Sequence, residues 1–186
     1  MKIREQIAKY VPCNEQEQRD QELILKFIDN SPDAFFRDNR LAHMTASAWV
    51  VNRERTKALM VYHKIYDSWS WTGGHADGET DLLAVAIREV EEETGVTAVP
   101  VSEDIYSLEV LTVDGHEKRG EYVSSHLHLN ITYLLEADES EKLRICEDEN
   151  RGVQWFDLAD ALRASTEPWF VERIYRKLNE KLPIIP

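Results

Sequence analysis

The fold is decided by the stretch Gly73-Gly74-His75-Ala76-Asp77-Gly78-Glu79-Thr80-Asp81-Leu82-Leu83-Ala84-Val85-Ala86-Ile87-Arg88-Glu89-Val90-Glu91-Glu92-Glu93-Thr94-Gly95-Val96. A glycine-rich loop leads directly into a segment whose apolar residues recur at helical spacing. This pattern predicts an amphipathic helix with one buried side. Gly95 stands where a left-handed glycine commonly ends a helix, so we expect the helix to stop there.

Three glutamates near the end of this predicted helix lie three or four residues apart, Glu89, Glu92 and Glu93. Side chains at that spacing share one helix face, and like charges there destabilise a helix. A bound cation would relieve the repulsion, and clustered carboxylate oxygens suit Mg²⁺ or Mn²⁺. Taken alone, the acidic run also fits a solvated helix face.

The spacing of the fixed residues resembles the signature of the Nudix hydrolases. Gly74 is followed by thirteen residues and then by Arg88-Glu89-x-x-Glu92-Glu93-x-Gly95 with an apolar residue after it. At background amino-acid frequencies, six such residues coincide by chance at roughly 10⁻⁷ per starting position. The resemblance therefore outweighs the solvated-face alternative.

One residue departs from the family pattern. Thr80 stands where the family normally has a supporting glutamate, and Glu79 or Asp81 could replace it after a small shift of the loop. Thr80 could instead cap the helix N-terminus, with Asp81 favourable to the helix dipole. The departure concerns the support of Arg88 more than the binding of metal.

The resemblance implies hydrolysis of a diphosphate linkage in a nucleoside diphosphate joined to another moiety, with water attacking phosphorus. It implies that Mg²⁺, or Mn²⁺ in its place, is bound by Glu89, Glu92, Glu93 and the backbone carbonyl of Gly73. Glu92 or Glu93 would accept the proton of the attacking water. Arg88 would pair with the glutamates and hold them in position, although an ordinary surface ion pair is the alternative.

Three further side chains are candidates for substrate contact. Trp71 precedes the double glycine and could stack on a base, or it could pack against the sheet edge. His126 and His128 alternate with apolar residues on a predicted strand, whose polar row usually faces solvent. If that row faces the carboxylates instead, both histidines become candidates for phosphate contact or proton transfer. As metal ligands two histidines without a third are less favoured, and they would suit zinc.

The acidic loop before the Trp155-Phe156 strand offers one more candidate. Nudix enzymes often place an additional carboxylate on such a loop, so Glu149 or Glu147 could supply an extra metal ligand or the base. A solvated loop is the simpler interpretation.

The remaining pattern predicts helices over residues 2–11, 15–29 and 167–182, and strands over 45–51, 57–63, 107–113 and 122–136. This order fits a mixed β-sheet flanked by helices. The resemblance implies an α/β fold, the Nudix-type α/β/α sandwich. We expect a single domain, with an N-terminal helical arm over residues 1–42 and the core and C-terminal helix over 43–186. The arm could be a lid, a dimer arm or a layer packed on the same domain.

Composition limits the remaining classes of function. With 186 residues, a net charge of −13 and 42% hydrophobic residues, the chain resembles an ordinary globular protein. The acidic charge argues against a non-specific nucleic-acid binder, which needs a basic patch. A polyphosphate substrate is compatible with it only if bound cations invert the local field.

The other expectations concern partners and location. No apolar run reaches the ~18–20 residues of a membrane span, and no signal-peptide core is visible. Cys13 and Cys146 give neither a disulfide framework nor a metal-binding pair. We therefore expect a cytoplasmic protein that acts on a small nucleotide-type substrate. A homodimer is compatible with the sequence. Two alternatives to the hydrolase stay open, a Nudix-fold isoprenoid-diphosphate isomerase and a non-catalytic ligand-binding module.

Overall fold

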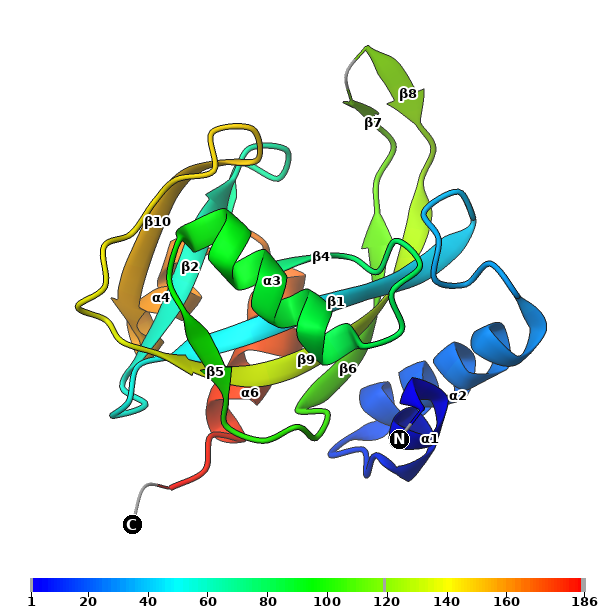
Figure 1. The fold of residues 1–186 in the computed structure, drawn as a ribbon, viewed down its shortest axis with the longest axis horizontal. Coiled ribbons are helices and arrows are strands. Elements are labelled where there is room, and N and C mark those ends of the chain that lie inside the picture. Colours follow the sequence, from blue (N-terminus) through cyan, green and yellow to red (C-terminus); the bar gives the residue numbers. More distant parts are fainter. Residues whose placement is uncertain (1, 119, 185–186) are drawn as a thin grey trace. The chain divides into compact units, whose positions relative to one another are not determined.

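The computed structural model describes residues 2–118 and 120–184 of the chain. Its helices and strands in chain order, most of them labelled in Figure 1, are α1 (Ile3–Lys9), α2 (Glu15–Asn30), β1 (Ala42–Val51), β2 (Lys57–His63), β3 (Ser68–Ser70), β4 (Thr72–His75), α3 (Leu82–Thr94), β5 (Ala98–Pro100), β6 (Ser107–Val113), β7 (His116–Lys118), β8 (Glu121–Val123), β9 (His126–Ala137), β10 (Asn150–Asp157), α4 (Leu158–Ala164), α5 (Pro168–Phe170), η1 (Val171–Tyr175) and α6 (Arg176–Glu180). The predicted strand over 122–136 is wrong in one respect, because two residues interrupt it between β8 and β9.

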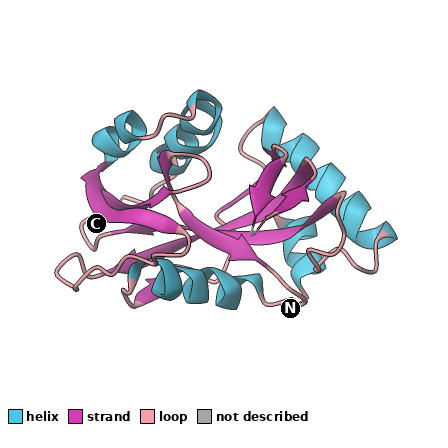
Figure 2. Ribbon diagram, turned by 90° about the horizontal axis from the view of Figure 1, so that it is seen from above, coloured by secondary structure: helices cyan, strands magenta, loops and turns pink. Residues whose placement is uncertain are grey.

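Within the described residues, eight strands form one sheet in the order β10-β2-β1-β9-β5, with β3 paired to β2, β4 to β1 and β6 to β9. β2 is antiparallel to β10, and β6 is antiparallel to β9. β1 and β9 run parallel, because the Leu41 carbonyl accepts from the Leu127 N–H and, further along both strands, Ser47 contacts Asn130. The sheet is therefore mixed, and helices flank it (Figure 2), which confirms the predicted fold class.

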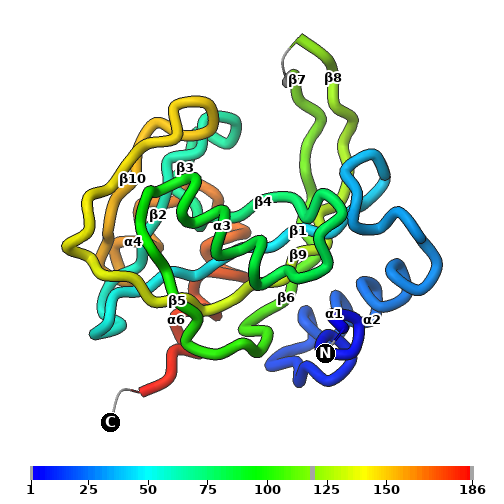
Figure 3. The backbone as a smooth tube through the Cα atoms, in the orientation of Figure 1, coloured from blue at the N-terminus to red at the C-terminus, as the bar shows by residue number. Residues whose placement is uncertain are grey.

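The chain divides into two compact units. Unit 1 comprises Met1–Ser47, Gly73–Val85 and Glu103–Tyr133, and unit 2 comprises Ala48–Thr72, Ala86–Ser102 and Leu134–Pro186. β1, α3 and β9 each begin in unit 1 and continue into unit 2. Figure 3 traces the path of the chain from the N-terminus to the C-terminus.

The N-terminal arm packs within unit 1. Asn14 caps α2, its side-chain oxygen accepting from the Glu17 N–H at 2.9 Å. Helix α2 lies against β6, where the fully buried Glu17 carboxylate accepts from the Ser107 hydroxyl at 2.9 Å. Asp20 accepts from the Val110 N–H at 3.1 Å, which satisfies a backbone donor of a strand that pairs on one side with β9. These bonds make the arm a layer of its own unit.

The polar face of β9 is buried in unit 1. Asn130 and Thr132 are 1% and 0% exposed, so for these two residues the expectation of a solvent-facing row is wrong. The Asn130 side-chain oxygen accepts from the hydroxyls of Thr45 and Ser47 at 3.0 and 2.9 Å. Its amide nitrogen donates to Glu109 at 3.2 Å. The polar row is buried because neighbouring strands supply its hydrogen-bond partners.

Unit 2 is built around an aromatic core. The Trp49 ring, which is fully buried, stacks on Tyr175 with ring centroids 5.4 Å apart. Tyr175 belongs to the C-terminal helical segment, in which the π-helical turn η1 joins α5 to α6. The predicted final helix is therefore confirmed, with one wider turn in its middle.

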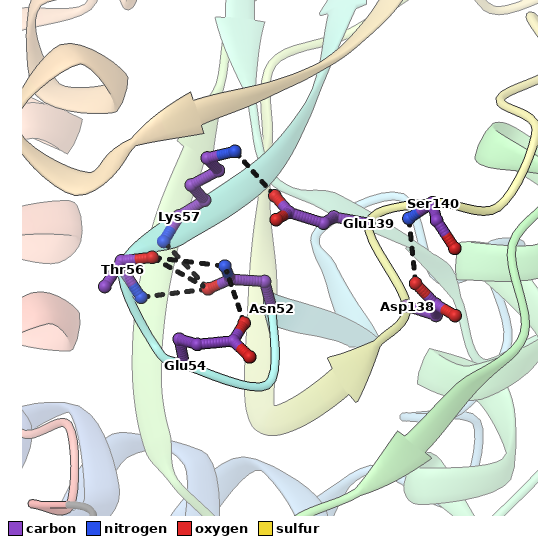
Figure 4. A network of polar contacts seen from close by, with 7 residues as sticks. All are labelled: Asn52, Glu54, Thr56, Lys57, Asp138, Glu139 and Ser140. Atoms are coloured by element: carbon purple, nitrogen blue, oxygen red, sulfur yellow. Dashed lines mark hydrogen bonds and ion pairs between the residues drawn. The ribbon is translucent and has the colours of Figure 1, made fainter.

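The hairpin loop between β1 and β2 has its own polar network, which Figure 4 shows. The Asn52 side-chain oxygen accepts from the N–H groups of Thr56 and Lys57 at 2.9 and 3.0 Å. Lys57 pairs with Glu139 at 2.7 Å. The Asn52 side chain thus fixes the turn that sets the register of Val51 opposite Ala58.

Candidate functional site

The helix of the box, α3, begins at Leu82 and is capped by Asp81. The Asp81 carboxylate accepts from the Ala84 N–H at 3.1 Å, which is the N-cap hydrogen bond. The prediction that Thr80 caps the helix is therefore wrong, since the helix starts one residue later than that role requires. Glu79 accepts from the N–H groups of Thr80 and Asp81 at 2.7 and 2.9 Å, so its carboxylate holds the loop backbone.

The double-glycine segment approaches β1 closely. A Cβ atom on Gly73 would lie 2.6 Å from the Ala46 carbonyl oxygen and in collision with Ser47. Only glycine fits this contact, which lies within unit 1. The proposed metal bond through the Gly73 carbonyl stays a prediction. At the other end of α3, Gly95 has φ +76° and ends the helix as expected.

The three box glutamates lie in unit 2 and differ in exposure. The Glu92 side chain is 61% exposed, that of Glu89 is 14% exposed, and Glu93 is buried. The Arg88 guanidinium lies 3.5 Å from Glu89 and 3.9 Å from Glu92. The expected pairing of Arg88 with both glutamates is present, although exposed pairs of this kind add little stability.

The pKa of Glu89 responds to its burial and to neighbouring charges, among them the Glu149 carboxylate. Burial is the first cause that raises the pKa of Glu89, and the Glu92 carboxylate is the second. Arg88 lowers this pKa, and the Glu149 carboxylate raises it further. The role of Glu149 as an extra ligand or base stays a prediction.

Asn150 was missed in the sequence. Its amide N–H donates to the backbone carbonyl of Glu93 at 3.2 Å, while its Oδ1 is buried and has no hydrogen-bond partner among the described residues. A buried acceptor without a donor costs about 1–3 kcal/mol. An amide oxygen is a hard ligand, as carboxylate oxygens are. Its position directly after Glu149 was the only signal in the sequence.

These residues fit a divalent cation of the magnesium class. The Glu89, Glu92 and Glu149 carboxylates and the unsatisfied Asn150 amide all offer oxygen atoms as ligands. Oxygen is a hard ligand, which Mg²⁺ prefers.

Trp71, the candidate for base stacking, is 8% exposed and lies in unit 2. Its ring packs edge-on against Tyr175 and Phe170, with centroids 5.7 and 6.3 Å apart. Packing accounts for most of its surface, and its contact with substrate stays a prediction.

His126 and His128 lie in unit 1, where they meet two histidines that sequence reasoning missed. His128 contacts His43 and His75, with ring centroids 5.0 Å apart in each pair. Burial, followed by the neighbouring histidines, lowers the pKa of His128 to about 2. Burial likewise lowers the pKa of His43. Both rings are therefore neutral at physiological pH.

The sequence model of the NUDIX domain matches residues 41–178, which is more than half of the chain. The chain belongs to the Nudix family. The membership confirms the resemblance seen in the box.

A human relative and several solved structures extend the comparison. The human protein "Nucleoside diphosphate-linked moiety X motif 6" is 27% identical over 141 residues, which are 74% of this chain and 42% of that protein. The chain thus spans about 42% of the length of this curated relative.

Two solved structures share the fold of this Nudix chain. The C. elegans Ap4A hydrolase in a binary complex has a TM-score of 0.52 at 19% identity, covering 74% of this chain and 93% of that one. The E. coli dihydroneopterin triphosphate pyrophosphohydrolase has a TM-score of 0.54 at 13% identity, covering 75% and 96%. At these identities the likeness concerns the fold alone.

Proposed function

We propose that this Nudix protein is a Mg²⁺-dependent hydrolase that cleaves a diphosphate linkage in a nucleoside diphosphate joined to another moiety. The observation that carries the proposal is the group of oxygen donors in unit 2. Burial, then the Glu92 carboxylate and more weakly that of Glu149 raise the pKa of Glu89, and the Asn150 oxygen has no hydrogen-bond donor among the described residues. Mn²⁺ would fit the same donors.

The roles of the chain's own residues follow from their exposure and contacts. Glu89 and Glu149, with the Asn150 oxygen, would hold the cation, and the Gly73 carbonyl would add a ligand. When bound, Mg²⁺ would neutralise phosphate charge and lower the pKa of an attacking water. Glu92 is the most exposed of the box carboxylates and can accept the proton of that water.

Two further residues complete the proposed site. Glu93 is the alternative proton acceptor and a further ligand, and its burial favours the ligand role. Arg88 contacts both Glu89 and Glu92 and would restrict their rotamers as a positioning residue.

The class of substrate rests on the relatives. The human relative is named for nucleoside diphosphates linked to another moiety, and one structural neighbour is an Ap4A hydrolase. Both names describe nucleotides with a phosphoric anhydride, so we extend a nucleotide-type substrate to this chain. Direct contacts of Trp71, His126 and His128 with that substrate, a homodimer and a cytoplasmic location belong to the same proposal.

Neither Cys13 nor Cys146 forms a disulfide within the described residues. None of the helices in residues 2–118 and 120–184 combines the length and the apolar composition that a membrane span requires.

The experiment is a hydrolysis screen in Mg²⁺, with the phosphomonoester products separated by anion-exchange chromatography, over nucleoside diphosphate sugars, ADP-ribose, dinucleoside polyphosphates, NADH, coenzyme A and nucleoside triphosphates. Glu92→Gln and Glu89→Gln should lower kcat by at least about 100-fold on any substrate found. Glu91→Gln is the matched control, since it removes one exposed charge from the same helix. Absence of turnover across the screen, or equal losses in all three variants, would contradict the proposal.

A further inference from the structure

Four of the six histidines of the chain converge in unit 1. The His43 ring on β1 lies 5.0 Å, centroid to centroid, from the rings of His75 on β4 and of His126 and His128 on β9. One ring nitrogen from each of His43, His75 and His128 lies within 4.8 Å of the other two. Neighbouring strands of the sheet therefore bring together three nitrogen atoms that could be metal ligands.

The hydrogen bond of His43 determines which of its nitrogens carries a lone pair. His43 Nδ1 lies 3.0 Å from the Asn39 carbonyl oxygen. A carbonyl only accepts, so Nδ1 carries the proton and Nε2 has the free lone pair. This Nε2 is buried and has no hydrogen-bond partner among the described residues, in a side chain that is 3% exposed.

The same reasoning applies to His126 and His128. His126 Nδ1 donates to the Ser124 carbonyl at 2.8 Å, so its Nε2 is an acceptor. His128 Nε2, 3.2 Å away, therefore donates to it, and the lone pair of His128 lies on Nδ1. Histidines that bind metals have this arrangement, in which the second nitrogen donates to a carbonyl or another acceptor.

The donor atoms select the class of ligand. The lone pairs on His43 Nε2 and His128 Nδ1 attract a cation. Imidazole prefers Zn²⁺, Cu²⁺ or Ni²⁺, whereas Mg²⁺ prefers oxygen. With Zn–N bonds of 2.0–2.1 Å, tetrahedral ligand nitrogens are about 3.3 Å apart, so nitrogens within 4.8 Å need shifts of less than about 1 Å each.

We propose that His43, His75 and His128 bind a zinc-class transition metal, in a site chemically separate from the carboxylates of the box. His126 is a positioning residue that orients His128. The ion would fasten β4, and with it the glycine-rich segment, to β1 and β9. Three protein ligands leave a fourth position for water or a substrate oxygen. This proposal does not depend on the proposed hydrolase activity.

The first test uses the full chain freed of metal with a chelator. Zn²⁺ added alone should bind at one ion per chain, measured by competition with a chromophoric chelator and by elemental analysis after gel filtration. A millimolar excess of Mg²⁺ should leave this binding unchanged. Co²⁺ in place of Zn²⁺ should give the intense visible absorption of a tetrahedral, nitrogen-ligated ion.

The variants assign the ligands. His43→Gln, His75→Gln and His128→Gln should each weaken Zn²⁺ binding by at least about 100-fold, because loss of a supporting partner alone costs 10- to 100-fold. His126→Gln should keep one ion per chain and weaken its binding by about 10- to 100-fold. His63→Gln is the matched control, since His63 lies in unit 2 and contacts Tyr66. Glu89→Gln controls for zinc held by the box carboxylates.

Circular dichroism identifies any variant that fails to fold. For such a variant, the Co²⁺ spectrum of the unmodified chain alone tests whether the ion is bound by nitrogen ligands. A spectrum of an octahedral, oxygen-ligated ion would overturn the proposal. So would absence of saturable Zn²⁺ binding, an equal loss in His63→Gln, or a loss confined to Glu89→Gln. If His126→Gln abolished binding as completely as His43→Gln, the assignment of three ligands would be wrong.

Discussion

The orientation of the Asn130 amide in the buried network of unit 1 leads to a sharp prediction for Asn130→Asp. This change preserves shape and replaces the nitrogen that donates to Glu109 by an oxygen, 3.2 Å from the Glu109 oxygen. Two charges at 3.2 Å repel by about 5 kcal/mol at an effective dielectric constant of 20. Asn130 is 1% exposed, so water cannot screen them.

The protein can avoid the repulsion by keeping the new carboxyl protonated. That costs about 1.4 kcal/mol for each pH unit above 3.9, the ordinary pKa of aspartate, or about 5.5 kcal/mol at pH 8. Both routes therefore predict that Asn130→Asp lowers the free energy of unfolding by about 5 kcal/mol at pH 8. A carboxyl with a raised pKa in the folded state loses stability as pH rises, so the difference should shrink to about 1.5 kcal/mol at pH 5.

The assay is urea denaturation of the variant and the unmodified chain at both pH values, followed by far-ultraviolet circular dichroism. Asn30→Asp is the control, because it adds the same charge at the exposed end of α2 and should cost about 0.5–1 kcal/mol. Equal stability of Asn130→Asp and the unmodified chain at pH 8 would refute the reasoning.

Three other variants test local features by the same denaturation assay. Asp81→Ala removes the N-cap of α3 and should cost about 1 kcal/mol, whereas Thr80→Ala should cost less than about 0.5 kcal/mol; the reverse order would restore Thr80 as the cap. Gly73→Ala should destabilise by about 1–3 kcal/mol, because its Cβ meets the Ala46 carbonyl; an unchanged midpoint would contradict that close approach. Glu17→Ala removes the acceptor of Tyr10, Cys13 and Ser107 and should cost about 3 kcal/mol or more, against about 0.5 kcal/mol for exposed Glu15→Ala.

Local sequence patterns predicted correctly the strands and the helix end that depend on residues close together in the chain. The strands over 57–63 and 107–113 have the predicted bounds, and Gly95 ends the box helix as expected. Apolar periodicity and a left-handed glycine act within a few residues, so the sequence carries them directly. The box spacing likewise identified the family, which the NUDIX domain match confirms.

The start of α3 shows where local reasoning was insufficient. Thr80 and Asp81 are both good N-cap residues, and composition does not distinguish them. Asp81 is the cap, and Glu79 accepts from the N–H groups of Thr80 and Asp81, which holds the loop in the conformation that places Asp81 at the helix start. Such competition between neighbouring caps is settled by the backbone path of the loop.

What the sequence determined by itself is the family, the main elements and the candidate carboxylates on one helix. What only the tertiary structure decided is which distant residues meet. His43 and His75 join His126 and His128 because β1 pairs with both β4 and β9, and no local pattern encodes strand order. The same pairing buries Asn130, and the start of β10 brings Asn150 to the Glu93 carbonyl of the box helix. Periodicity fixes a side chain's face, whereas its partners depend on contacts between segments far apart in the chain.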